Sequence, residues 1–300
     1  MKGKNKKLLG VFVLLLISNL IFLFVGGKSS GVSFNEQKFA LLDTAGVSFI
    51  KLNDIKLSRG PQGHWLVDEE YAVDPNLDRL LFSILNRVRV QKPVEVPQEE
   101  GIKVEISGDQ PMTFHVWGNP TKTRTYFSMD DEEEVYQVQI PGYNEYVGGI
   151  FELNKDQWRD RLVLNDSWRT IQKLQLDYQD ESKQDLTISF DKDFFLVEGV
   201  QQLDSNLVVN YLNQFQYFQA NEWISKGRFP RYDSLSAMPV LAKLTIESIN
   251  YDLPILLEIY PKLPGDRIYL VMTYDESMFV VDDQRMSQIL LENKDFEIAD

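Results

Sequence analysis

The feature that most constrains the fold is an internal repeat. Residues 63–88 (GHWLVDEEYAVDPNLDRLLFSILNRV) align at one constant offset with residues 193–218 (DFFLVEGVQQLDSNLVVNYLNQFQYF). Trp65 matches Phe195 in this alignment, and identical pairs are Leu66 and Leu196, Val67 and Val197, Asp74 and Asp204, Asn76 and Asn206, and Leu77 and Leu207. Further matches follow in the same order: DIKLS (54–58) with DLTIS (185–189), Pro111 with Pro254, Tyr126 with Tyr269, Met129 with Met272, and Asn154-Lys155-Asp156 with Asn293-Lys294-Asp295. Because these matches occur in the same order in both parts of the chain, they predict two similar halves, 46–163 and 168–300, that arose by tandem duplication.

Each half is expected to be a βββ-α-ββββ-α unit with mostly antiparallel sheet, so the fold class is α+β. In the first half, short apolar or alternating runs predict strands at 46–52, 54–59, 63–68, 101–107, 111–118, 123–129 and 134–140. Asp74 and Pro75 are typical of the N-cap and first position of a helix. The apolar stripe of that helix consists of Leu77, Leu80, Leu81, Ile84, Leu85 and Val88. We expect Pro93 and Pro97 to end this helix, and a short helix over about 143–152 to close the half.

The N-terminus predicts a membrane anchor. MKGKNKK is basic, and the following run from Leu8 to Val25 is apolar except for Ser18 and Asn19. As a helix this run spans about 27 Å, close to the hydrocarbon thickness of a bilayer. We therefore expect residues 1–27 to form a cytoplasmic tail and a transmembrane signal anchor, and residues 28–45 to form a tether. The positive-inside rule places the body across the cytoplasmic membrane, on its periplasmic or outer side. The alternative is a cleaved signal peptide with a mature chain that starts after Gly27.

The composition excludes several classes of function. The formal charge is −14 although the first seven residues carry four lysines, so the body is acidic and nucleic-acid binding is not expected. There is no cysteine, which excludes disulfides, thiolate metal sites and cysteine nucleophiles. No nucleotide-binding or hydrolase motif is present, and no cofactor is predicted.

Two acidic stretches could each be either a functional site or a solvated turn. In HWLVDEEYAVDPNLDRLL (64–81), five carboxylates lie beside His64, but at the aligned places His64, Glu69 and Glu70 become Phe194, Gly199 and Val200. Only Asp74 keeps its type, as a helix N-cap requires, so we interpret the stretch as a hairpin leading into a capped helix. MDDEEE (129–134) lacks the spacing of a calcium loop and is also read as a turn. The second histidine, His115, is far from His64 in sequence, and no metal site is predicted.

The candidate partner contacts are Trp158, Arg159, Asp160, Arg161, Tyr217 and Trp223. The WRDR motif (158–161) lies at the junction between the halves. It is either a salt-bridged clamp that fixes the halves or a docking site for a partner, and the sequence does not separate the two. Tyr217 and Trp223 lie in an aromatic-rich segment (213–223) and are either exposed partner contacts or core residues.

These features together resemble one known family. The apolar anchor, the strand–helix segment WLV…YAVDP…LDRLL and the WRDRLVL junction resemble the domain-of-unknown-function 4340 family. The resemblance implies a bacterial envelope protein with one N-terminal membrane helix and a repeated α+β body. Members of that family are often encoded beside subunits of ABC-type transporters, including the gliding-motility type. The resemblance supplies no catalytic residues.

The sequence therefore favours a non-catalytic, membrane-anchored accessory or scaffold subunit of an envelope complex, such as an ABC-type transporter or gliding-type machinery, with other envelope proteins as partners. Two alternatives remain open. One is a carboxylate-dependent envelope hydrolase acting on glycans, which needs two facing acids about 5–10 Å apart. The other is a ligand-binding module that uses the groove between the repeats.

Overall fold

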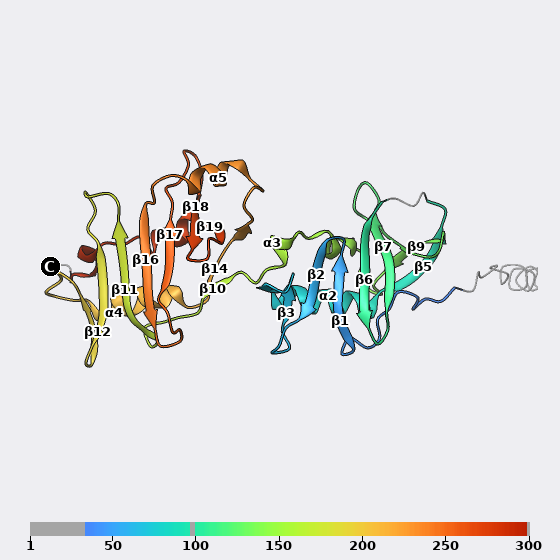
Figure 1. The fold of residues 1–300 in the computed structure, drawn as a ribbon, viewed down its shortest axis with the longest axis horizontal. Coiled ribbons are helices and arrows are strands. Elements are labelled where there is room, and N and C mark those ends of the chain that lie inside the picture. Colours follow the sequence, from blue (N-terminus) through green and yellow to red (C-terminus); the bar gives the residue numbers. More distant parts are fainter. Residues whose placement is uncertain (1–33, 97–99, 299–300) are drawn as a thin grey trace, which may run out of the picture.

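The structure, a computed structural model, describes residues 34–96 and 100–298. Two lobes lie side by side along the longest axis of the molecule, and each is built on one large antiparallel sheet with few helices (Figure 1). We call residues 34–160 the first lobe and residues 161–298 the second lobe. The predicted membrane anchor, residues 1–27, lies outside the described residues. Among those described, no helix is both long enough and apolar enough to cross a membrane.

The first lobe contains a nine-stranded sheet with the order β4-β3-β2-β1-β6-β7-β8-β9-β5. Its strands are β1 (Val47–Leu52), β2 (Ile55–Arg59), β3 (Trp65–Val67), β4 (Tyr71–Ala72), β5 (Arg89–Val94), β6 (Ile102–Gly108), β7 (Met112–Gly118), β8 (Thr125–Met129) and β9 (Val135–Gln139). Its helices are α2 (Pro75–Arg87), the 3-10 helix η1 (Gly148–Glu152) and the single turn α3 (Lys155–Trp158). The predicted α+β class is thereby confirmed for this lobe.

The second lobe contains an eight-stranded sheet with the order β13-β12-β11-β16-β17-β18-β19-β15, and a two-stranded sheet of β10 and β14. Its strands are β10 (Leu162–Leu164), β11 (Ile171–Tyr178), β12 (Leu186–Asp191), β13 (Phe194–Val197), β14 (Phe218–Gln219), β15 (Glu222–Ile224), β16 (Ala242–Ser248), β17 (Ile255–Ile259), β18 (Ile268–Thr273) and β19 (Met278–Asp282). Its helices are α4 (Ser205–Leu212), η2 (Asn213–Phe215), α5 (Pro230–Ser236), α6 (Asp283–Ser287) and η3 (Asn293–Phe296).

Without β4, the strand order of the first sheet matches that of the second sheet place by place. The pairing register matches as well: Ser58 is opposite Leu66 in the first sheet, and Ser189 is opposite Leu196 in the second. An irregularity interrupts β1 against β6 after Val47, and another interrupts β11 against β16 after Ile171. Register fixes which side chains face the core, so the two sheets present their strands to the core in the same way.

The structure corrects three of the residue matches expected from the sequence. Met129 is opposite Phe114, and the residue opposite the corresponding Leu257 is Thr273, so Met129 corresponds to Thr273 rather than Met272. By the same register Tyr126 corresponds to Leu270 rather than Tyr269. Asn154 and Glu292 are the residues that cap α3 and η3, so Asn154 corresponds to Glu292 and not to Asn293. All three errors are single-residue slips, because short strands and turns hold too few identities to fix an alignment.

Three element boundaries also differ from expectation. The predicted helix ends at Arg87, and residues 89–94 form the edge strand β5, which tolerates Pro93 because an edge strand need not donate every backbone N–H. The expected helix over 143–152 is reduced to η1. Phe39 and Leu41, expected in the tether, are buried in the first core.

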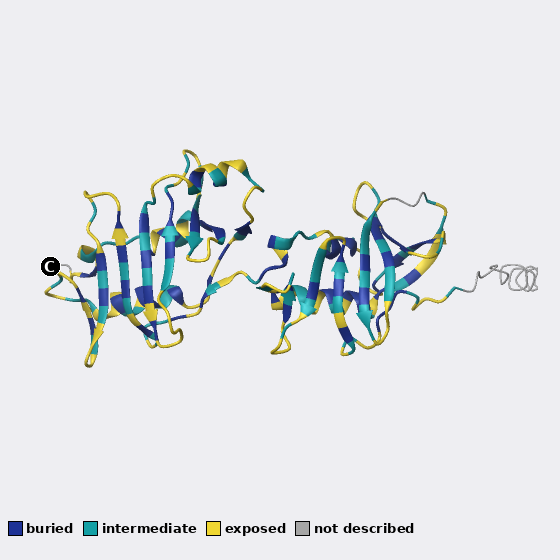
Figure 2. Ribbon diagram, viewed as in Figure 1, coloured by how far each residue is buried: buried dark blue, intermediate teal, exposed yellow. Residues whose placement is uncertain are grey.

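The core of each lobe lies between its sheet and its helices. Buried positions recur along the strands of both sheets, as alternating pleated strands require (Figure 2). Trp65 is 7% exposed and packs against Phe82 of α2 with a centroid separation of 5.1 Å, and Phe195 is 2% exposed. Smaller clusters cover part of the opposite faces, around Trp117 in the first lobe and Tyr232 in the second.

A groove beside helix α2

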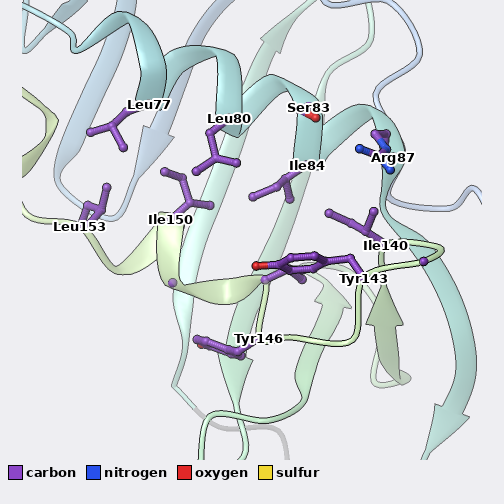
Figure 3. A pocket seen from close by; sticks show the side chains of 13 residues that line it. Leu77, Leu80, Ser83, Ile84, Arg87, Ile140, Tyr143, Tyr146, Ile150 and Leu153 are labelled. Atoms are coloured by element: carbon purple, nitrogen blue, oxygen red, sulfur yellow. The ribbon is translucent and has the colours of Figure 1, made fainter.

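One structural feature that the sequence analysis did not predict is an open groove of about 500 Å³ beside α2 (Figure 3). One wall is the outer side of α2, and the other is the segment from Ile140 to Leu153 that includes η1. The side chains that line it are mostly apolar, with Arg87 near one end: Leu77, Leu80, Ile84, Ile140, Tyr143, Tyr146, Val147, Ile150 and Leu153. An open apolar channel of this kind suits a peptide segment or an apolar ligand.

Helix α2, whose N-terminal end is fixed by Asp74, forms the first wall. Asp74 is 8% exposed and its carboxylate accepts the Asn76 backbone N–H at 2.8 Å, as predicted for the N-cap. The backbone N–H of Asp74 also donates to the Trp158 carbonyl at 2.9 Å. On the inner side of the helix Leu81 is buried, while Leu80 is 48% exposed and faces the groove. The predicted apolar stripe was therefore too wide, since Leu80 does not belong to the core.

The second wall is organised around Tyr146. Backbone atoms of Gly118 and Gly148 lie against its ring so closely that a Cβ at either position would come within 2.6 Å and 2.3 Å of Tyr146 atoms. The Tyr146 hydroxyl donates to Glu152, and the Lys122 ammonium lies 5.0 Å from the ring centroid. Burial, with the hydrogen bond to Glu152, raises the pKa of Tyr146 far above its ordinary value. Tyr146 is therefore a neutral wall residue and not a proton acceptor.

The second lobe gives an internal comparison for this groove. Counting from the equivalent N-caps Asp74 and Asp204, the positions of Leu80 and Ile84 in α2 are occupied by Asn210 and Gln214. Asn210 lies in α4 and Gln214 in the following η2, so amides stand at two positions where α2 carries groove-lining aliphatic side chains, while Leu207 keeps the leucine of Leu77. The fold therefore does not require an aliphatic residue at the position of Leu80.

The groove continues into a polar cleft of about 380 Å³ at the junction of the lobes, because Leu77 and Leu153 line both. This cleft is lined by Asp74, Asp156, Gln157, Arg161, Asn221 and Glu222 in addition to those two leucines. Asp156 is 4% exposed and its carboxylate accepts the Ser225 backbone N–H at 3.0 Å and the Ser225 hydroxyl at 2.6 Å. Arg228 bridges Asp156 at 3.2 Å and Glu222 at 2.9 Å. Asp156 thus joins the two lobes, and Glu222 holds Arg228 in place within the second lobe.

The WRDR motif lies at this junction. Arg159 is 7% exposed, and its guanidinium carbon lies 3.5 Å from the Tyr71 ring centroid and 4.0 Å from the Trp223 ring centroid. Burial lowers the pKa of the Arg159 guanidinium, which still remains charged. The Trp223 indole N–H donates to the Asp160 carbonyl at 2.8 Å. Two aromatic side chains, one from each lobe, therefore hold the arginine between them.

The other residues predicted as partner contacts differ in where they lie and in how exposed they are. Trp158 is fully buried, and Arg161 lies 3.9 Å from Asp74. Tyr217 is 62% exposed in the turn before β14, where its carbonyl accepts a hydrogen bond from Arg285 at 2.9 Å. The structure brings Trp158, Arg159, Asp160, Arg161 and Trp223 together at the junction.

Acidic residues of the two stretches lie beside lysine or histidine side chains. Glu69 and Glu70 are exposed in the turn before β4, with Lys56 and Lys155 nearby. In the 129–134 turn, Asp130 accepts a hydrogen bond from His115 at 2.8 Å, whereas His64 is exposed in another turn. Within residues 34–96 and 100–298, no group of three or more histidine, aspartate or glutamate side chains is placed to hold a metal ion.

Comparison with known proteins identifies no relative of this chain. No protein-family model matches the chain, and no curated protein or solved structure is significantly similar to it. Functional conclusions therefore depend on the site itself.

Proposed function

We propose that this protein is a non-catalytic scaffold of the cell envelope that holds an apolar segment of a partner protein in the groove beside α2. The observation that carries the proposal is the exposed side chain of Leu80, opposite Tyr143 and Ile150, at a position where the equivalent helix α4 of the second lobe carries Asn210. Exposed apolar surface costs free energy in water, and a bound apolar segment would remove it.

The envelope assignment is part of the proposal and comes from the sequence. The basic N-terminus followed by the apolar run from Leu8 to Val25 supports a single-pass anchor in the cytoplasmic membrane, with the body on the periplasmic or outer side. The resemblance to the domain-of-unknown-function 4340 family supports a place beside an ABC-type transporter or gliding-type complex. Two lobes with the same strand order and register support an origin by tandem duplication.

A glycan hydrolase is less well supported, because the acids beside the groove have other roles. Asp74 caps α2, Asp156 is bonded to Ser225 and Arg228, and Glu222 is paired with Arg228. A glycosidase needs one carboxylic acid free to protonate the leaving group and a second carboxylate facing it. The junction acids instead fit a role in fixing the geometry of the two lobes.

The test is site-specific photo-crosslinking of the full-length chain in intact cells. A photoreactive amino acid at Leu80 is compared with the same amino acid at Asn210, the exposed position that corresponds to Leu80 in α4. We expect a protein adduct at Leu80 and little at Asn210, with the crosslinked partner peptide rich in apolar residues. Equal yields at the two positions, or an adduct peptide that is wholly polar, would contradict the proposal.

A further inference from the structure

A separate apolar surface lies on the second lobe, at the tips of two neighbouring hairpins. The turn from Ile249 to Pro254 joins β16 to β17, and the turn from Tyr274 to Ser277 joins β18 to β19. Because these four strands are consecutive and antiparallel, both turns lie at the same end of the sheet. We define the tip surface as Ile249, Tyr251, Leu253 and Tyr274, which are 67%, 43%, 77% and 85% exposed. Three of them, Tyr251, Leu253 and Tyr274, line one shallow hollow of about 570 Å³.

The fold does not require apolar residues at these tips. The corresponding turns of the first lobe connect β6 to β7 and β8 to β9, and they contain Asp109-Gln110-Pro111 and the acidic run 130–134. Hairpin turns are normally polar because their side chains face water. The corresponding turns of the first lobe thus carry no large apolar side chain apart from Pro111, so the four large side chains at the tips are a specific feature of the second lobe.

The longer turn is held in place by a buried carboxylate. Asp166 is 1% exposed, and its Oδ1 accepts hydrogen bonds from Ser248 at 2.7 Å, Asn250 at 2.8 Å and Thr170 at 2.9 Å. The backbone N–H of Ile249 donates to the Thr170 carbonyl at 3.0 Å. Three hydrogen bonds to Oδ1 offset part of the cost of burying this carboxylate, whose Oδ2 has no hydrogen-bond partner among the described residues, and they tie the turn to the segment before β11.

This network belongs to the second lobe. By register, Ser248 opposite Ile171 corresponds to Gly108 opposite Val47, and glycine has no hydroxyl to donate. A turn that is fixed before binding loses less conformational entropy when a partner docks on it. The apolar tips are thus both exposed and preorganised.

We infer that the tip surface docks a second protein whose contact surface has an apolar centre and a rim of lysine or arginine. The charges of the two turns decide the occupant. They contain Asp252, Asp275 and Glu276, and neither 248–254 nor 273–277 contains a lysine or arginine. A second copy of this chain would bring the same acids into contact, and an anionic lipid surface would be repelled in the same way. A protein surface with an apolar centre and a basic rim complements both the apolar tips and their acidic rim.

The inference does not depend on the α2 groove, and its test has its own controls. The full-length chain carries a photoreactive amino acid at Tyr274 or Leu253, and the matched controls carry it at Asp131 or Gln110 in the corresponding turns of the first lobe. We expect protein adducts at the tip positions and not at the controls, with the partner peptide containing apolar residues and lysine or arginine. Leu253→Asp should reduce the Tyr274 adduct by roughly tenfold, the loss typical of an interface anchor. Thermal unfolding should be unchanged, since Leu253 is exposed.

Charge reversal tests the rim directly. Asp252→Lys with Glu276→Lys should also lower the adduct yield by roughly tenfold if the partner is basic. An unchanged or higher yield would overturn the inference. Adducts to a second copy of the chain, to lipid alone, or to a partner segment without lysine or arginine would overturn it as well. The Leu80 adduct, measured in parallel, reports on the groove separately.

Discussion

At the scale of single residues, the junction combines the stacking of Arg159 with ion pairs across the lobes, Arg228 with Asp156 and Arg161 with Asp74. Arg159 lies between Tyr71 of the first lobe and Trp223 of the second lobe, away from water. A desolvated guanidinium over an aromatic face contributes about 2 kcal/mol or more, several times the value of an exposed ion pair. One side chain can therefore contribute substantially to the attachment of the lobes.

Arg159→Ala is expected to lower the free energy of unfolding by about 2–4 kcal/mol, because two ring contacts are lost together. Arg159→Lys should recover only part of this, since an ammonium lacks the planar face that stacks. Urea unfolding followed by tryptophan fluorescence measures both. The matched control is Arg169→Ala, because Arg169 stacks on Trp168 at 5.3 Å but is exposed, and we expect about 0.5 kcal/mol or less. A similar loss for the two alanine variants would contradict the role assigned to burial.

Asp74 and the neighbouring acids should respond differently to mutation. Asp74→Ala removes the N-cap of α2 and should lower stability by about 0.5–2 kcal/mol. The double variant Glu69→Ala, Glu70→Ala should change it little, because exposed ion pairs contribute roughly 0–1 kcal/mol. Chemical denaturation of purified variants checks both. If the double variant folds normally but loses partner adducts at Leu80, the turn is part of a binding site.

His115 and Asp130 predict a local pH dependence. The hydrogen bond from His115, helped by Lys103, holds the pKa of Asp130 below its usual range. The folded-state pKa is thus lower than the unfolded one, so the stabilisation is present above the unfolded pKa of about 3.9 and is lost as pH falls through the folded pKa. His115→Gln should raise the pKa of Asp130 toward its ordinary value. Carboxyl NMR titration measures the shift, and an unchanged Asp130 pKa would show that the contact is not formed in solution.

At the scale of elements, α2 serves both the core and the groove. Leu81 is 1% exposed and faces the sheet, whereas the adjacent Leu80 is 48% exposed and faces the groove. Helical spacing alone permits this division, because an apolar stripe wider than the contact with the sheet leaves residues for a second surface.

The two neighbouring leucines should therefore separate stability from binding. Leu81→Ala is expected to cost about 2–5 kcal/mol of unfolding free energy. Leu80→Ala should stay within about 0.5 kcal/mol of the parent while it weakens partner capture at a photoreactive residue placed at Ser83, another groove residue. Thermal or chemical unfolding of both variants provides the comparison. Equal destabilisation by the two substitutions would mean that Leu80 belongs to the core.

At the scale of the whole molecule, each lobe has its own main core, and the two main cores share no residue. The lobes meet through the Arg159 sandwich and the Asp156–Ser225–Arg228 contacts. Two main cores joined by these contacts suit a scaffold that presents the α2 groove on one lobe and the tip surface on the other.

Damage to one core should consequently remain largely within one lobe. Trp65→Ala removes a buried ring packed on Phe82 and should destabilise the first lobe by about 3–5 kcal/mol. Hydrogen exchange with peptide-level resolution should show faster exchange in β1–β9, while β11, β12 and β16 keep their protection. Loss of protection in both lobes to the same extent would show that they unfold as one unit.

The sequence by itself determined the elements whose signals are local. The apolar alternation of the strands, the Asp74 and Asp204 caps and the repeat of the strand–helix segment predicted an antiparallel α+β body. These features need only neighbouring residues to be recognised, because pleat, cap and helical stripe have fixed short periods.

Only the tertiary structure decided which apolar residues stay outside the core. Leu80 belongs to the apolar stripe predicted from the sequence, but the fold leaves it exposed in the groove, and Leu253 is exposed on the tip surface. The sequence also placed Arg159 at the junction without showing its partners, since Tyr71 and Trp223 come from distant parts of the chain. Such contacts depend on how two independently folded sheets meet, and no local period in the sequence encodes that geometry.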